Sequence, residues 1–592
     1  MINNKDFDNS SYSSYKIIID NQTISNSEYP VISIQTIQNI NKIPSALIIF
    51  RDGEEDIDNF ENSSSNFFNP GNKIEIKLGW GGNDYTVFKG IIIRHSISAS
   101  ERKGSFLKIY CRNEALKMTT HVKSKCYNEL EGDNLIIEEV FNNNSINVTT
   151  NGEFANNKSL IQYDLSDWDF ALERTEANGK VIYYSNEDDK FVIEDPDASG
   201  SSLFTYQLGK DIIKFDAEAD AEFQLENINT YSWNSEEQEM KKQESVDLDF
   251  NTFQNSGIKS DELASILNQD EIELKHGGER SSDEFKFWVK AKKTISELSK
   301  VQGSLQILGD SRYEIANCIS VDGVGDKFSD NLFITGIKHT LNSDGFYTDI
   351  VFGIDNVIKS NFLNNKNSSS FFSNISGLQT GIVTNIIDEE SLNRIEVNIP
   401  ILGQESKIWC RVLYSDAGSE RGFFSLPEID DEVILGFINN DPQCPIVLGF
   451  LYSKKNVPVV TTEEITEENY IKGWFSKSNI SVLVNDEERS IEIKTPDNTF
   501  IKLEDETKSI EICDVNENKI KLDENGINVE SSSDINFKST GDIIFSSDGD
   551  LNVNGSNISI NANQNATVEG SSGTDIKSSG NTVIKGSMVQ IN

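Results

Sequence analysis

Four histidines and six cysteines are the side chains of this protein best suited to bind a metal ion. The histidines are His95, His121, His276 and His339, and the cysteines are Cys111, Cys126, Cys318, Cys410, Cys444 and Cys513. The sequence contains no HExxH motif and no CxxC pair, and no histidine joins cysteines at the short spacings typical of zinc sites. We therefore expect buried reduced thiols, no zinc site and no cofactor.

One stretch near the C-terminus, Asp550-Leu551-Asn552-Val553-Asn554-Gly555, fits the opening of an EF-hand calcium loop. An EF-hand requires a bidentate Glu at its twelfth position, which is Asn561 here. Leu551 and Val553 also belong to a longer apolar repeat, and that repeat generates the same alternation. We interpret the match as a by-product of the repeat and predict no calcium site there.

Asp167 and Asp169 flank Trp168 and invite comparison with a pair of catalytic carboxylates. Residues 168–177 have a helical pattern, however, and acidic residues at a helix start more often cap the helix. The sequence also contains no G-x-S-x-G elbow and no P-loop motif. These observations predict that the protein is not an enzyme.

The charge of the chain limits its partners. Asp and Glu number 96 against 53 Lys and Arg, so the formal net charge is -43. Such an anionic surface repels nucleic acid, which we exclude as a main partner. No apolar stretch reaches the ~20 residues of a membrane span, and the first residues lack an apolar signal core. We expect synthesis in the cytoplasm without a signal peptide.

The N-terminal region, residues 1–375, is predicted to be mainly β with minor helix. Segments such as 15–20 and 32–35 largely alternate apolar and polar residues, as half-buried strands do. One helix is well marked, because Ser281 and Glu284 form a capping box and Gly303 is placed as its stop. The polar tract 364–376 is predicted to be a linker.

Residues 376–455 are predicted to form a small OB-fold barrel. Five short apolar segments follow one another closely, namely 381–383, 394–397, 408–412, 432–437 and 445–449. OB barrels can bind nucleic acid, but this one lacks a clear basic stripe along its surface. We therefore expect the barrel to have a structural role. Residues 456–478 are interpreted as a linker or neck.

Residues 479–592 are the predicted needle, and from Ile527 onwards apolar pairs recur there every seven or eight residues, with Gly, Asn, Ser and Asp in the gaps. The expected core consists of Ile535, Phe537, Ile543, Phe545, Leu551, Val553, Ile558, Ile560, Val568, Ile576 and Ile584. Upstream, the pairs 491/493, 501/503, 510/512 and 520/522 repeat more loosely, which predicts a meander of longer strands. A fixed short period is typical of a β-solenoid.

An eight-residue unit supplies one inward pair and one turn, which cannot enclose a core alone. Three intertwined chains would give each layer three faces around one apolar interior, so we predict a homotrimeric, triple-stranded β-helix. A single-chain solenoid is the alternative. An ion held on the trimer axis is left open.

Several segments resemble, in the same order, motifs of the VgrG and contractile phage tail hub-and-spike family. They are 68–80 with 87–91, Asp167-Trp168-Asp169-Phe170 with Glu176-Ala177-Asn178-Gly179, 332–339 with 345–348, and 441–449. Glu176 and Ala177 stand in the reverse of the family's order. Together with the barrel and the octad repeat, the resemblance covers almost the whole chain.

The resemblance implies a structural spike of a contractile injection system. Its hub, residues 1–375 here, docks on the inner tube and baseplate, and its needle pierces a target envelope to deliver cargo effectors. It also implies release outside the cell on firing. A PAAR-type tip protein is expected at Met588, Val589, Gln590, Ile591 and Asn592. Type VI secretion systems, extracellular particles and phages all use this plan.

Two other classes of protein are alternatives. A trimeric tail fibre or adhesin that binds a cell surface is also a β-rich needle, but it does not need hub motifs. A β-helical polysaccharide lyase or hydrolase needs a wider solenoid than eight-residue units provide.

Overall fold

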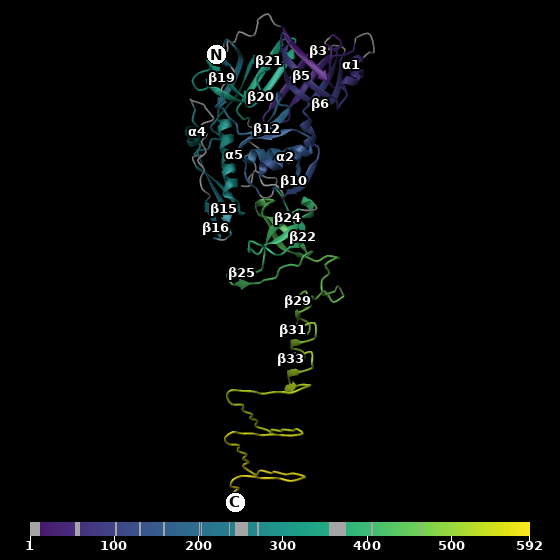
Figure 1. Cartoon of the computed structure of the whole chain (residues 1–592), viewed down its shortest axis with the longest axis vertical. Coiled ribbons are helices and arrows are strands. Elements are labelled where there is room, and N and C mark those ends of the chain that lie inside the picture. Colours follow the sequence, from purple (N-terminus) through teal and green to yellow (C-terminus); the bar gives the residue numbers. More distant parts are fainter. Residues whose placement is uncertain are drawn as a thin grey trace. The chain divides into compact units, whose positions relative to one another are not determined.

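The computed structural model of the chain (Figure 1) describes residues 12–25, 27–53, 60–100, 104–128, 132–157, 160–200, 202, 204–235, 237–242, 258–268, 271–354, 374–403, 406–461 and 463–591. Two compact units, Met1–Val457 and Pro458–Asn592, make up the chain, and each is described by itself. The predicted linker 364–376 lies mostly outside the described residues.

A thirteen-stranded sheet forms much of the first unit. Its strands are β1 (Ser13–Ile19), β2 (Gln22–Thr23), β3 (Val31–Asn39), β4 (Ser45–Arg51), β5 (Lys73–Trp80), β6 (Asn83–Ser100), β7 (Gly104–Arg112), β13 (Thr205–Gln207), β14 (Ile212–Ala219), β18 (Val301–Leu308), β19 (Cys318–Asp322), β20 (Asn331–Asn342) and β21 (Gly345–Phe352). Their order is β14-β18-β21-β20-β3-β4-β7-β6-β5-β1-β2, with β13 and β19 off this path. The late strand β20 thus pairs antiparallel with the early strand β3, and this pairing joins the first and last parts of the N-terminal region in one sheet. In β4 the alternate residues Ala46, Ile48 and Phe50 are buried, as the period-two pattern predicts.

A smaller part with helices belongs to the same unit. It comprises η3 (Glu114–Thr119), β8 (Val122–Tyr127), α2 (Asp133–Asn143), β9 (Val148–Thr150), β10 (Leu160–Ser166), α3 (Asp167–Ala177), β11 (Val181–Ser185) and β12 (Lys190–Glu194). Phe141, Trp168, Phe170 and Phe191 form its aromatic core. The predicted helix 168–177 is therefore confirmed as α3, and its N-cap is Ser166, whose hydroxyl accepts the Asp169 N–H.

The capping box correctly predicted the start of α5 (Ser282–Lys300), because the Ser281 hydroxyl accepts the Glu284 N–H at 3.2 Å. The prediction that Gly303 stops this helix is wrong. The chain passes from Lys300 directly into β18, and Gly303 lies inside that strand. A Cβ at Gly303 would lie 2.2 Å from the Asp216 carbonyl oxygen, so close strand pairing with β14 explains the glycine.

Beside α5 lies a three-stranded sheet with the order β16-β15-β17. It consists of β15 (Asn227–Asn234), β16 (Glu239–Lys242) and β17 (Glu271–His276). The short helices of the hub are α1 (Glu61–Ser64), η2 (Asn66–Phe68) and α4 (Ser260–Ile266). Because β17 ends at His276 and α5 begins at Ser282, a short loop connects them.

The five predicted OB strands are confirmed as a closed barrel. They are β22 (Gln379–Asn385), β23 (Ile395–Asn398), β24 (Lys407–Val412), β27 (Glu432–Phe437) and β28 (Pro445–Leu451), in the order β22-β23-β24-β28-β27. Shorter elements are η4 (Pro400–Leu402), β25 (Ala417–Gly418), β26 (Arg421–Gly422) and η5 (Ile438–Asn440). Val383, Val397, Val433 and Val447 fill the barrel, and Ile161 of the hub packs against the same core.

The second unit starts with a seven-stranded antiparallel meander, β29 (Ile471–Phe475), β30 (Ser481–Asn485), β31 (Ser490–Lys494), β32 (Phe500–Glu504), β33 (Ser509–Cys513), β34 (Lys519–Asp523) and β35 (Gly526–Glu530). Residues 531–591, all of them described, have extended backbone with no strand pairing inside the chain (Figure 1). The mainly β fold is thus confirmed, and the meander lies where the looser repeat predicted it. The intertwining of three chains stays a prediction.

Candidate functional sites: the needle and the hub–OB junction

The predicted needle core is uncovered in the single chain. Every one of its eleven residues is at least 48% exposed, and Ile560 is 79% exposed. Of the ring contacts found between described residues, one involves this set, an edge-on contact of Phe537 with Phe545 at 6.4 Å between centroids. One chain therefore does not bring these side chains together into a core.

The predicted tip residues have the same character. Met588 and Ile591 are 84% and 87% exposed, Val589 and Gln590 are exposed as well, and Asn592 lies outside the described residues. Exposing two large apolar side chains to water to this extent is unfavourable in free energy.

The meander stacks its apolar pairs in register. Ile491 faces Leu503 and Ile493 faces Ile501 across β31 and β32, and the pairing continues strand by strand to β35. Side chains alternate between the faces of a strand, so these residues form one apolar face. That face is about half exposed in the single chain.

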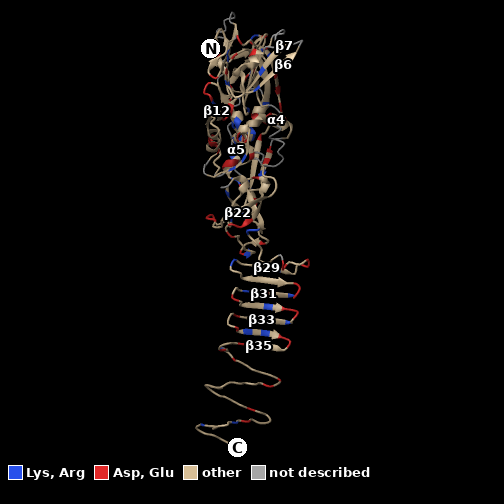
Figure 2. Cartoon of the chain, turned by 90° about the vertical axis from the view of Figure 1, so that its right-hand side faces the viewer, with Lys and Arg blue, Asp and Glu red and all other residues tan. Residues whose placement is uncertain are grey.

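Charged residues are coloured along the meander in Figure 2, and the pairing register places those that lie between the apolar residues on the opposite face. Glu492 faces Lys502, Lys502 faces Glu511, and Glu511 faces Lys521. Lys519 adds a diagonal ion pair to Glu511 at 2.6 Å. Opposite charges directly across from one another favour this strand register over a slipped one.

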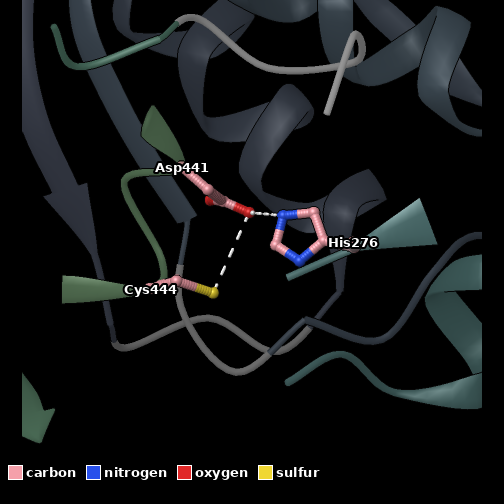
Figure 3. A group of neighbouring side chains, drawn as sticks. All are labelled: His276, Asp441 and Cys444. Atoms are coloured by element: carbon pink, nitrogen blue, oxygen red, sulfur yellow. Dashed lines mark hydrogen bonds and ion pairs between the residues drawn. The ribbon is translucent and has the colours of Figure 1, made fainter. Parts of the chain in front are cut away.

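A buried polar cluster lies where the hub meets the OB barrel (Figure 3). His276 ends β17, Asp441 follows η5, and Cys444 directly precedes β28. His276 Nε2 lies 2.9 Å from Asp441 Oδ2, and Cys444 Sγ lies 4.0 Å from the same oxygen. The ligand atoms of the three residues lie within 4.8 Å of one another.

Charged neighbours complete this cluster. The Arg280 guanidinium binds Asp441 Oδ2 and also both Glu284 carboxylate oxygens, at 3.1 and 3.2 Å. Burial, and then the charge of Arg280, lower the pKa of His276, whereas burial raises the pKa of the Cys444 thiol. Both groups are therefore neutral at pH 7 when no further cation is bound.

Sequence reasoning missed this cluster, because its members come from segments far apart; Arg280 and Asp441 are separated by 161 positions. Motif searches detect short ligand spacings only. The one available signal was the 441–449 segment, whose Asp441 accepts the Gln443 N–H at 2.9 Å and so shapes the loop that presents Cys444.

The carboxylates singled out at the start of α3 have structural partners. Asp167 pairs with Lys123 at 2.5 Å and accepts a hydrogen bond from Gln162, and Asp169 accepts the Ser166 hydroxyl at 2.6 Å. These contacts support the interpretation that the two acids hold the helix start. Within the described part of the chain, no helix is long and apolar enough to cross a membrane.

Two family models match the chain. Residues 9–343 match the Alg8 N-terminal domain, and residues 379–452 match the type VI secretion system/phage-baseplate injector OB domain. The first match covers more than half of the chain and the second covers the closed barrel.

Curated relatives match over short stretches. The actin cross-linking toxin VgrG1 of Vibrio cholerae is 43% identical over 61 residues, 10% of this chain and 6% of that protein. The type VI secretion system spike protein VgrG3 of Vibrio cholerae is 33% identical over 72 residues, 11% and 7% of the two chains. The chain thus matches only a small fraction of the length of these relatives.

A solved structure of a Francisella PdpA–VgrG complex in a half-lidded state resembles the chain with a TM-score of 0.50. The likeness covers 88% of each chain at 11% identity, so it concerns the fold.

Proposed function

We propose that this chain, which belongs to the Alg8 N-terminal domain family, is the structural spike of a contractile injection system. The observation that carries the proposal is the injector OB domain at residues 379–452, which follows a β-rich hub and precedes the needle. The role is mechanical: the hub docks on the inner tube and baseplate, and the needle pierces the target envelope to deliver cargo.

We propose further that the spike is a homotrimer. Residues 531–591 of one chain expose their apolar pairs and have no strand pairing within the chain, so this part of the needle lacks a core and the strand partners that its backbone groups need. Two further copies supply both, since each adds an apolar face and a strand edge to every layer. The apolar face of the meander continues the same interior, and its charged face is left to water.

A separate tip protein of PAAR type is the proposed partner of the last repeat unit, residues 586–592. Met588 and Ile591 offer apolar contacts from each subunit, and their backbone, which has no strand pairing within the chain, can offer hydrogen bonds. The tube, the baseplate and cargo effectors are the other proposed partners, and firing would carry the spike outside the cell.

Light scattering on the purified full chain tests the trimer. We expect a species of three times 66.3 kDa that stays intact at micromolar concentration. A stable monomer whose C-terminal unit is folded would contradict the proposal. The tip is tested by deleting residues 586–592, which should abolish binding of the tip protein while the trimer persists.

The function itself is tested in the producing cell. Deleting the gene should leave injection particles that lack a spike or do not assemble, and the full-length chain should restore them. If the particles assemble and fire normally but lose attachment to target cells, the alternative of a fibre or adhesin is favoured.

A further inference from the structure

The junction cluster of His276, Asp441 and Cys444 has the composition of a metal site. Among the residues that the structure describes, it is the one group of at least three His, Cys, Asp or Glu side chains whose ligand atoms lie close enough together to hold a metal ion. An imidazole nitrogen, a carboxylate oxygen and a thiolate are all donors that Zn²⁺ accepts. We propose that these three side chains bind a divalent ion of the zinc class, which links the hub to the OB barrel.

The histidine is oriented for this role. His276 Nδ1 lies 3.1 Å from the Gly278 carbonyl oxygen and 3.0 Å from the Gly278 N–H, so either tautomer has a backbone partner. When Nδ1 carries the proton and donates it to the carbonyl, the lone pair of Nε2 faces Asp441. A metal-bound histidine commonly donates its other ring N–H to a backbone carbonyl in this way.

The metal-facing nitrogen lacks a hydrogen bond. Although Nε2 lies 2.9 Å from Asp441 Oδ2, it makes no hydrogen bond of normal geometry to any described residue. The His276 side chain is completely buried. A buried polar atom without a partner is unfavourable, and a coordinated ion would satisfy it.

Formal charge gives an independent argument. Asp441 and Glu284 are two carboxylates that pair with one guanidinium, that of Arg280. The buried cluster therefore holds one excess negative charge, which is costly in a low-dielectric environment. A divalent ion bound to a deprotonated Cys444 brings the formal charge to zero.

The loop leaves room for the thiol. A Cβ on Gly278 would lie 2.4 Å from Cys444 Sγ and 3.0 Å from His276 Cε1. A side chain at position 278 would therefore push the sulfur away from the other two ligands. The glycine allows hub and barrel to approach closely enough for a shared site.

The experiment uses the full chain. After incubation with zinc and removal of free metal by gel filtration, elemental analysis should find about one zinc per chain. With Co²⁺ in place of zinc, the visible and near-ultraviolet spectrum should show thiolate-to-cobalt charge transfer. Cys444→Ser should abolish that band and lower retained zinc at least tenfold, and His276→Gln should lower it similarly.

Matched variants separate ligation from general damage. Cys513→Ser and His339→Gln each remove one residue of the same type outside the cluster, and both should retain zinc and the cobalt band. If Cys444→Ser retains as much zinc as Cys513→Ser does, the proposed metal site is wrong. A cobalt-loaded full chain without the thiolate band would also overturn the site, a result that does not depend on any variant folding.

Discussion

Lys502 in β32 lies directly opposite Glu511 in β33, and each has a second opposite charge on its other side, Glu492 and Lys521 respectively. The charge alternation runs across four strands, on the face opposite the apolar pairs. We infer that it fixes strand register where the single chain has no covered core.

Reversing one charge tests this role. Lys502→Glu places three glutamates in a row, and each like-charge contact costs roughly 0.2–1 kcal/mol in each subunit. We expect a lower melting temperature of the C-terminal unit, measured by calorimetry. The quadruple variant Glu492→Lys, Lys502→Glu, Glu511→Lys and Lys521→Glu restores the alternation at unchanged net charge and should recover the loss. If it melts as low as the single variant, the alternation does not govern register.

Glu176 should make the hub less stable as the pH rises. Burial raises its pKa from 4.5 to about 7, although Asn41 donates a hydrogen bond to it at 3.1 Å. The folded state thus keeps the proton longer than the unfolded state, and stability is lost between about pH 4.5 and 7. Glu176→Gln should stabilise the hub at pH 8 by roughly 3 kcal/mol and have little effect at pH 4. Equal gains at both pH values, or a similar gain from the exposed control Glu226→Gln, would contradict this origin.

His339 should have the opposite pH dependence. Burial lowers its pKa from 6.5 to about 4, despite the nearby charge of Asp310, and its Nδ1 lies 2.9 Å from Thr348 Oγ1. The unfolded state binds the proton first, so stability falls as the pH drops from 6.5 towards 4. His339→Gln should weaken the pH dependence of the hub's stability. Between pH 7 and 4.5 the variant should lose roughly 2 kcal/mol less unfolding free energy than the wild type, measured by thermal melting. The exposed His121→Gln is the control and should keep the wild-type slope.

Local patterns predicted the elements well. The Ser281–Glu284 capping box located the start of α5, because capping is decided by a few adjacent residues. The spacing of Ile491 and Ile493, and of the pairs that follow, located the strands of the meander, since the side-chain period of a strand is a local property.

Features that depend on distant residues could not be predicted in the same way. Gly303 has the position of a helix stop in the sequence, but its actual constraint comes from the Asp216 carbonyl of a paired strand. His276 and Cys444 meet because the barrel packs on the hub. Neither contact can be predicted from the spacing of neighbouring residues in the sequence.

The inward assignment of the needle pairs can be tested at adjacent positions. Ile560 belongs to an apolar pair, whereas Ser559 lies between its two members and points to the other face of an extended chain. Ile560→Asp would bring three carboxylates together in the apolar interior of a trimer, at a cost of several kcal/mol each before neutralisation. We expect it to abolish the trimer, measured by light scattering, while the hub keeps its melting transition. Ser559→Asp adds the same charge and should leave the trimer mass unchanged. Loss of the trimer in both variants, or in neither, would mean that Ile560 does not face the interior.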